Sequence, residues 1–290
     1  MGQSVILTLS QAEWDRALSH FSNPHPFAFS WVLNALCPGS WIPMMDSDSG
    51  ALLALPVRKL GPFPVISRQP FFLRTCGIHA EQPVNEAQVM RFWKALPPGL
   101  WKLHVYWNQP VPGKTTRTRI HQALDLNSDF SYKGNVRRNL KKAQSQDLKS
   151  FTPSARETDE AFFAHRGKDM AQLHGAPRQR MRQLMLEAEN RHAAVYWGFK
   201  DHHEQLHAAG FFIRTGRTLL FVHGGATEAG KKSGAMYLVM DQAVQYGREQ
   251  GLAVLDFGGS NVQGVADFYR GFGAEDQTYY EIQARWPLFI

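Results

Sequence analysis

Cysteine is scarce in this chain: Cys37 and Cys76 are the only two among 290 residues. They lie far apart and form no C-x-x-C pair or Cys/His ligand pattern, which argues against a structural zinc site. We therefore expect no metal. So few thiols suit a reducing compartment, where disulfides are rare. The sequence predicts two free, mostly buried thiols in a cytoplasmic protein.

The chain also lacks a long apolar run. No stretch approaches the roughly 18 to 20 residues that a helix needs to cross a bilayer. The segment from Met1 to Leu7 has no positive stretch followed by an apolar one, as a secretory signal has. It also does not match the myristoylation pattern at Gly2. We expect a soluble, cytoplasmic protein with no transmembrane segment.

Repeats, low-complexity tracts and heptad arrays are not visible either. A hydrophobic content of 43% with 12% aromatic residues is ample for a buried core, and the length suits one large or two medium domains. Thirty-two Lys+Arg against 25 Asp+Glu give a net charge of +7 and a pI near 9.5. This balance favours anionic partners such as phosphates, nucleotide-linked sugars, RNA or anionic lipid surfaces.

The first half of the chain predicts mixed helices and strands. A capping box from Ser10 to Glu13 starts one helix, because each side chain satisfies the other residue's backbone N–H. Further helices are expected from Ser30 to before Pro38 and over about 85–96. Alternating or apolar runs predict strands over 51–57, 63–67, 100–107 and 118–126.

Residues 132–147 have the pattern of a basic amphipathic helix. Its apolar residues form one stripe, while Lys133, Arg137 and Lys141 follow one another at four-residue spacing, where like charges repel. An anion or a neighbouring carboxylate would offset that repulsion. The segment, with Arg138, is therefore either a solvated charged face or an anion site. Its place at the junction of the two halves favours the anion site.

The second half repeats the mixture of helices and strands. Helices are expected near 158–166, 178–190, 236–247 and 265–272. Strands are expected over 193–199, 205–214, 218–223, 253–257 and 278–284. The pattern predicts an α/β (α+β) protein.

Several short motifs occur in an order that is typical of one family. They are Leu55 to Lys59, Gln69 to Phe71, Asn135 to Ala143, Asp256 to Ser260, and Phe268 to Gly273. Together they resemble the FemAB/FemX-like branch of the GNAT acyltransferase fold over nearly the entire chain. The resemblance implies two joined GNAT-like domains, each a mixed, mostly antiparallel sheet flanked by helices. Residues 1–147 would form the first, including the basic helix, and 148–290 the second, which would hold the acyltransferase site.

The chain departs from that branch in two places. Where relatives have a lysine that holds the charge of the leaving group, this chain has Tyr269 followed by Arg270, and one of these would have to replace it. The acyl-CoA loop of GNAT enzymes, Arg/Gln-x-x-Gly-x-Gly/Ala, is half matched by Lys231 to Met236. The helices between 158 and 190 are also too short for the coiled-coil arm of some relatives. The donor therefore stays open between acyl-CoA and aminoacyl-tRNA.

The reaction implied is attack of a neutral amine on an activated acyl carbon. His223 is a candidate base, since an unperturbed histidine has a pKa of about 6.5. Asp256 is a candidate for orienting the amine, although a carboxylate at a strand end more often caps the following turn. Tyr269 is either a proton donor to the leaving group or a core residue. Gly224 and Gly225 either aim a backbone N–H at the carbonyl oxygen or form a bulge.

The cations supply candidate substrate-binding residues. Lys231, Lys232 and Gly234 stand at the start of a predicted helix, where backbone N–H groups and the helix dipole favour an anion. Arg270 and the basic helix would supply a second cationic wall. The residues of that helix are Arg137, Arg138, Lys141 and Lys142. Arginine can hold a phosphate through two parallel hydrogen bonds, whereas lysine acts as a point charge.

These features predict a bacterial N-acyltransferase or aminoacyltransferase whose acceptor is an amine on a phosphate-bearing peptidoglycan, other cell-wall or surface-polysaccharide precursor. Two alternatives stay open. One is a non-catalytic nucleic-acid or anionic-ligand binder that uses the basic helix on a GNAT scaffold. The other is an acetyl-CoA-dependent acetyltransferase of small amines. A tRNA is a candidate partner in the aminoacyl case, and the sequence does not predict the oligomeric state.

Overall fold

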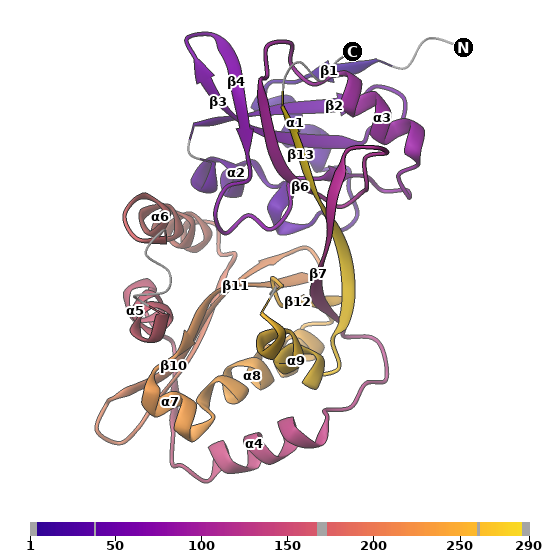
Figure 1. The fold of residues 1–290 in the computed structure, drawn as a ribbon. Coiled ribbons are helices and arrows are strands. Elements are labelled where there is room, and N and C mark those ends of the chain that lie inside the picture. The colour runs from indigo at the N-terminus through magenta and orange to yellow at the C-terminus, as the bar shows by residue number, and fades with distance from the viewer. Residues whose placement is uncertain (1–4, 38, 167–172, 260–261, 286–290) are drawn as a thin grey trace. The chain divides into compact units, whose positions relative to one another are not determined.

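A computed structural model describes residues 5–37, 39–166, 173–259 and 262–285 (Figure 1). The chain forms two compact units: unit 1 comprises 1–120 with 278–290, and unit 2 comprises 121–277. The domain boundary expected at residue 147 stays a prediction. In the structure, the basic helix lies inside unit 2.

Unit 1 is built on a mixed sheet in the order β1-β2-β3-β4-β6-β13, with β5 paired to β3. Neighbours are antiparallel except β4 and β6, which are parallel. The strands are β1 (Ile6–Thr8), β2 (Ser40–Asp46), β3 (Leu52–Leu60), β4 (Phe63–Arg68), β5 (Ile78–His79), β6 (Lys102–Trp107) and β13 (Glu275–Arg285). The helices are α1 (Gln11–Leu18), η1 (Pro26–Ala28), α2 (Ser30–Leu36) and α3 (Glu86–Lys94).

The sheet of unit 1 is buried on both faces along the first six residues of β3 but only on one face along β6. Along β6 the apolar residues Leu103, Val105 and Trp107 are buried, whereas the residues that alternate with them, Lys102, His104 and Tyr106, are at least partly exposed. This alternation is the normal pattern of a strand that covers a core on one side only.

Unit 2 has a sheet in the order β7-β12-β11-β10-β9-β8. Neighbours are antiparallel except β11 and β12, which are parallel. The strands are β7 (Thr115–Asp125), β8 (Lys149–Phe151), β9 (Ala194–Lys200), β10 (Leu206–Thr215), β11 (Thr218–Ala226) and β12 (Val254–Asp256). The helices are α4 (Gly134–Gln144), α5 (Ala155–Arg166), α6 (Ala176–Asn190), α7 (Glu228–Ser233), α8 (Ala235–Glu249) and α9 (Gln263–Gly271).

Two helices pack closely on opposite faces of the sheet of unit 2 (Figure 1). A Cβ atom added at Gly225 of β11 would lie 3.1 Å from the backbone oxygen of Ala161 in α5. One added at Gly210 of β10 would lie 2.9 Å from Val239 in α8. Glycine at these positions thus allows each helix to approach the strands without a side chain between them.

The predicted fold class is confirmed, with helices packed on mixed, mostly antiparallel sheets. The prediction of two free, buried thiols is also confirmed. The sequence patterns missed the strands β1, β2, β5 and β8. Among the described residues, no helix combines the length and the apolar content that a membrane span requires.

Candidate anion-binding surface and buried polar residues of unit 2

All the residues predicted for the site lie in unit 2, but the structure divides them between its surface and its interior. The cations of α4 and α7 are exposed, whereas His223, Asp256 and Tyr269 are only 1%, 3% and 6% exposed. Ser260, at the end of one motif, is outside the described residues. In the described part of the chain, no group of three or more His, Cys, Asp and Glu residues is arranged to hold a metal ion.

Helix α4 presents an exposed row of positive charge. Its apolar residues Val136, Leu140 and Ala143 are buried. Its cations Arg137, Arg138, Lys141 and Lys142 are exposed. Arg137 donates from Nη1 to the backbone oxygen of Tyr132 at 2.9 Å. The other three form no ion pair with any carboxylate in the part of the chain that the structure describes, so their charge is uncompensated there.

The short helix α7 carries the second pair of predicted cations. Thr227 caps it, because its Oγ1 accepts a hydrogen bond from the backbone N–H of Gly230 at 3.1 Å. Lys231 and Lys232 lie in the last turn, and Nζ of Lys231 is 3.5 Å from a Glu228 carboxylate oxygen. Gly234 then adopts a left-handed conformation, with φ of 80°, and joins α7 to α8.

The two basic segments are neighbours in unit 2. A Cβ atom added at Gly234 would lie 3.4 Å from the backbone oxygen of Asn139 and 3.6 Å from Cβ of Ala143. Both residues belong to α4, so the junction between α7 and α8 packs against this helix. We call the exposed cations of these two segments that lack a bond to the chain's own backbone the α4–α7 cation surface. It consists of Arg138, Lys141, Lys142, Lys231 and Lys232.

Strands β11 and β12 pair over only three residues, and the last pair joins Leu220 to Asp256. Beyond that pair, β11 continues to Ala226 and contains an irregularity opposite Phe211 and Phe212 of β10. This confirms a bulge in the segment before Gly224. The alternative role, a backbone N–H that binds an acyl oxygen, stays a prediction.

Asp256 caps the turn that follows β12. One of its carboxylate oxygens, Oδ1, accepts a hydrogen bond from the backbone N–H of Gly258 at 2.8 Å and lies 3.6 Å from Nδ1 of His121. The capping role expected for a carboxylate at a strand end is therefore confirmed. A role in orienting the amine stays a prediction.

His223 lies in the interior of unit 2. Its Nε2 is 3.5 Å from Oδ1 of Asp159, and its ring centroid is 4.0 Å from that of Phe162. Burial lowers the pKa of His223 below its usual value, although the nearby Asp159 carboxylate opposes this effect. A buried neutral imidazole can accept a proton only if the surrounding structure admits a substrate. Its role as a base stays a prediction.

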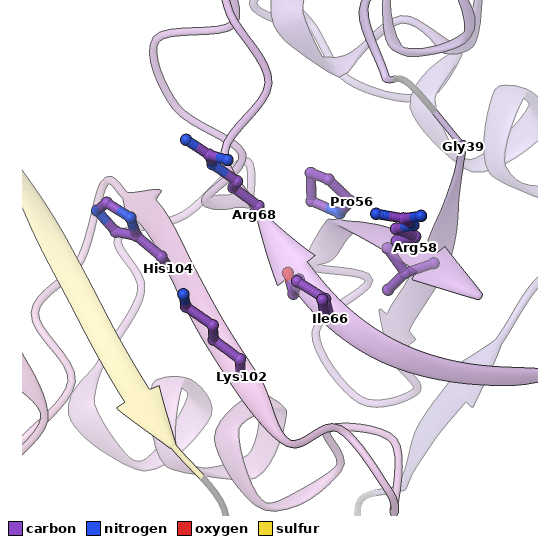
Figure 2. A pocket seen from close by; sticks show the side chains of 9 residues that line it. Gly39, Pro56, Arg58, Ile66, Arg68, Lys102 and His104 are labelled. Carbon is purple, nitrogen blue, oxygen red and sulfur yellow. The ribbon is translucent and has the colours of Figure 1, made fainter. Parts of the chain in front are cut away.

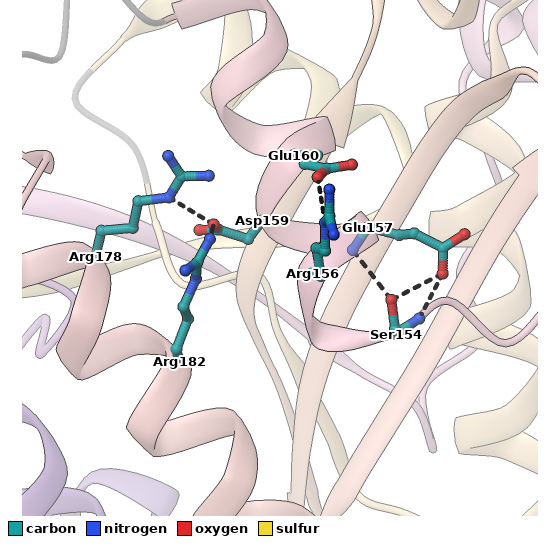
Figure 3. A network of polar contacts seen from close by, with 7 residues as sticks. All are labelled: Ser154, Arg156, Glu157, Asp159, Glu160, Arg178 and Arg182. Carbon is teal, nitrogen blue, oxygen red and sulfur yellow. Dashed lines mark hydrogen bonds and ion pairs between the residues drawn. The ribbon is translucent and has the colours of Figure 1, made fainter.

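The partner of His223, Asp159, was not singled out by the sequence. Burial raises the pKa of this carboxyl, but hydrogen bonds from His223, Arg178 and Arg182 outweigh that effect and lower the pKa overall. Nε of Arg178 is 2.6 Å from Oδ2 of Asp159, and Nη2 of Arg182 is 2.8 Å from the same oxygen (Figure 3). Both arginines lie on α6. The only signal in the sequence is their i, i+4 spacing, which does not identify the acid that they bind.

Tyr269 packs in the core. Its ring stacks on Phe257 with centroids 4.8 Å apart, which agrees with the core alternative for this residue. Arg270 points to two carboxylates: Nη1 is 2.7 Å from Asp267, and Nη2 is 2.8 Å from Asp276. Its charge is therefore compensated within unit 2. Proton donation by Tyr269 and substrate binding by Arg270 stay predictions.

Residues 131–270 match the family model described as the acetyltransferase (GNAT) domain. The matched range begins three residues before α4, ends in α9 and contains every residue predicted for the site. No curated protein matches the chain in sequence.

Three solved structures are similar to nearly the whole chain. A crystal structure of FemX has a TM-score of 0.68 at 9% identity, and the match covers 96% of this chain and 97% of FemX. The C-terminal domain of a putative lysylphosphatidylglycerol synthetase from Agrobacterium fabrum has a TM-score of 0.57 at 13% identity, covering 94% and 92%. A tandem GNAT protein from the clavulanic acid biosynthesis pathway has a TM-score of 0.53 at 10% identity, covering 98% of both chains.

At these identities the structural likeness shows the fold alone. Residues 131–270 are thus similar to the GNAT acetyltransferase domain, and the chain shares its fold with FemX and with a tandem GNAT protein. The resemblance to the FemAB/FemX-like branch of the GNAT fold, which the sequence motifs indicated, is confirmed.

Proposed function

We propose that this protein is an acyltransferase that moves an acyl or aminoacyl group from a phosphate-bearing carrier to an amine. The observation that supports this most directly is the α4–α7 cation surface, which lies within the match to the GNAT domain. Three of its cations, Arg138, Lys141 and Lys142, have no carboxylate partner among the described residues. A carrier with several phosphates would compensate their charge.

Both candidate donors have the required chemistry. Acyl-CoA carries a diphosphate and a further phosphate, and aminoacyl-tRNA carries a phosphate at each nucleotide. Gly234 itself is buried against α4, so the exposed side chains of Lys231 and Lys232 are better placed to meet a phosphate than its backbone. For tRNA, affinity should also fall steeply as salt rises, because bound cations release counterions from the polyanion.

The proposed reaction needs no covalent intermediate on the protein. The neutral amine attacks the acyl carbon, the bond between that carbon and the sulfur or oxygen of the carrier breaks, and the amine loses a proton. The fork where β11 and β12 separate after Leu220 and Asp256 is the proposed place for the acyl group. Backbone N–H groups of the segment that continues β11 would then stabilise the developing charge on oxygen.

For the acceptor, we favour an amine on a phosphate-bearing precursor of the cell wall or of a surface polysaccharide. One structural neighbour is named a putative lysylphosphatidylglycerol synthetase, and this name combines an aminoacyl group, lysyl, with an anionic phospholipid. That name supports a pairing of aminoacyl transfer with a phosphate-bearing acceptor on this fold. A cytoplasmic location in a bacterium belongs to the same proposal, because both donors are made in the cytosol.

A donor panel tests the proposal. The purified protein is incubated with radiolabelled acetyl-CoA or with radiolabelled lysyl-tRNA, together with a nucleotide-linked peptidoglycan precursor that carries a free amine. We expect the label to move to the amine with one donor. The double substitution Arg138→Gln and Lys142→Gln should raise KM for that donor by about 10-fold, as expected for the loss of charge-assisted contacts.

The control removes two exposed cations that lie outside the surface, through Lys59→Gln and Lys149→Gln. It should leave KM within about twofold, because only nonspecific charge is lost. Saturable donor binding without any transfer would favour the non-catalytic binder. Transfer of acetyl groups to small amines, but not to the precursor, would favour the small-amine acetyltransferase.

A further inference from the structure

Unit 1 contains a pocket of about 630 Å³ (Figure 2). None of the catalytic or substrate-binding residues predicted from the sequence lines it. It opens on β3, β4 and β6, outside the part of the chain that matches the GNAT domain. The volume lies within the range of roughly 300 to 1,000 Å³ that is usual for small-molecule sites. The pocket is therefore large enough for a ligand of nucleotide size.

Three strands present cations to this pocket. Arg58 of β3 pairs in register with Ile66 of β4, which pairs with Lys102 of β6, so these three side chains share one face. Two residues further along the same face, Arg68 pairs with His104. Figure 2 shows the side chains of β3, β4 and β6 around the pocket.

The positive charge of the pocket is uncompensated within the described residues. Arg58, Arg68 and Lys102 are exposed, and within those residues none of them forms an ion pair. Glu281, a carboxylate on the same face of the sheet, already binds Nε of Arg119 at 2.8 Å and Nε2 of His104 at 3.0 Å. Three uncompensated cations around one cavity repel each other, and a multiply charged anion would relieve that repulsion.

The remaining walls limit the type of anion. Pro56 and Ile66 line the pocket beside the cations, so part of it is apolar. A lone phosphate would fill little of the volume. Arginine binds phosphate oxygens through two parallel hydrogen bonds, and lysine adds a point charge. The lining thus suits a molecule that combines phosphate groups with an apolar or planar part.

We infer that this pocket is a binding site for a phosphorylated small molecule, of the class of a nucleoside diphosphate, held by Arg58, Arg68 and Lys102. The assignment depends on the chemistry of unit 1 alone and holds whether or not unit 2 transfers acyl groups. It adds to the α4–α7 cation surface a second anion site, on a different part of the chain.

Calorimetric titration of the full chain tests this site, with inorganic diphosphate and adenosine diphosphate as probes. We expect saturable binding below 1 mM for at least the nucleotide, and Arg58→Gln and Arg68→Gln should each weaken it about 10-fold or more. Lys59→Gln is the matched control: it removes the same charge from the neighbouring position of β3, outside the lining. It should change the affinity by less than about twofold.

Three results would overturn the assignment. They are the absence of saturable binding of both probes, equal losses for Arg58→Gln and Lys59→Gln, and binding only to phosphatidylglycerol vesicles, which would indicate a lipid surface. Lys149→Gln, which removes an exposed cation of β8 outside both sites, should bind the probes as the wild type does, which separates this pocket from general surface charge. Circular dichroism melting confirms that each variant is folded.

Discussion

Nε2 of His223 lies 3.5 Å from Oδ1 of Asp159, and both side chains are fully buried in unit 2. The other carboxylate oxygen of Asp159, Oδ2, forms ion pairs with Arg178 and Arg182. One buried carboxylate thus connects β11, α5 and α6. Because a buried charge is costly without its partners, this connection gives Asp159 a large effect on stability.

The first prediction concerns the removal of that charge. Asp159→Asn keeps the size of the side chain but leaves two arginines beside a neutral amide. We expect it to lower the free energy of unfolding by about 3 kcal/mol, the usual cost of breaking a buried ion pair. The measurement is urea unfolding followed by circular dichroism.

The control for this substitution is Glu160→Gln, one residue further along α5. Glu160 pairs with Arg156 at 2.8 Å, but both side chains are well exposed, at 49% and 82%. An exposed i, i+4 pair contributes less than about 0.5 kcal/mol. Equal losses for Asp159→Asn and Glu160→Gln would show that Asp159 has no special role.

The second prediction concerns acid destabilisation through His79 of β5. Burial, with a smaller effect of nearby His25, lowers the pKa of His79 to about 3. The unfolded chain binds a proton at this residue below pH of about 6.5, while the folded chain does not until about pH 3. The stability contribution of neutral His79 is therefore complete above about pH 6.5 and falls as the pH decreases between these values.

By this argument, His79 costs the wild type about 2 kcal/mol of unfolding free energy between pH 6.5 and pH 5. Over the same interval, the free energy of unfolding of the variant His79→Gln should therefore fall by about 2 kcal/mol less than that of the wild type. His223, whose pKa is also lowered by burial, should contribute in the same direction. The exposed His202 provides the control: if His202→Gln flattens the pH dependence as much as His79→Gln does, the explanation is wrong.

Sequence patterns predicted the elements in which local signals agree. The capping box predicted at Ser10 satisfies backbone N–H groups at the start of α1, and the helix expected over about 85–96 is present as α3, which begins after a capping box at Asn85. The basic helix was also predicted, because its apolar residues follow the helical spacing, and the structure shows that this apolar stripe is buried. Strand β2 was missed because Pro43 and a lack of alternation conceal it, and it is held by pairing with β1 and β3.

The site was only partly predictable, because the sequence shows local clusters of residues but not the tertiary contacts between them. The cations of α4 and Lys231 and Lys232 form local clusters that are visible in the sequence. Their contact through Gly234 depends on tertiary packing. The pocket of unit 1 needs three strands in register, and Arg58, Arg68 and Lys102 share no sequence motif. No local pattern specifies such a combination.

The third prediction concerns the two thiols. Cys76 is 1% exposed and Cys37 is 8% exposed. Burial raises the pKa of Cys76 well above its usual value, so the reactive thiolate is not formed at neutral pH. We expect an aromatic disulfide reagent to modify neither thiol on the minute timescale in buffer, and both after denaturation. Rapid modification of the folded protein would contradict the packing around β3 and β6.

The last prediction compares two glycines in helices. A Cβ atom added at Gly230 of α7 would lie 1.8 Å from the backbone oxygen of His207, a contact that only backbone movement can relieve. Gly230→Ala should therefore lower the free energy of unfolding by about 2 kcal/mol or more. Because α7 carries Lys231 and Lys232, the substitution Gly230→Ala should also weaken donor binding.

Gly264 of α9 is the matched case, since nothing lies within 4 Å of an added Cβ atom there. Gly264→Ala should raise the free energy of unfolding by about 0.5 to 1 kcal/mol, because alanine restricts the unfolded chain and favours the helix. The measurement is thermal and urea unfolding of both variants. A Gly230→Ala protein as stable as Gly264→Ala would show that α7 does not pack against β10 as described, and the position of Lys231 and Lys232 beside α4 would lose its support.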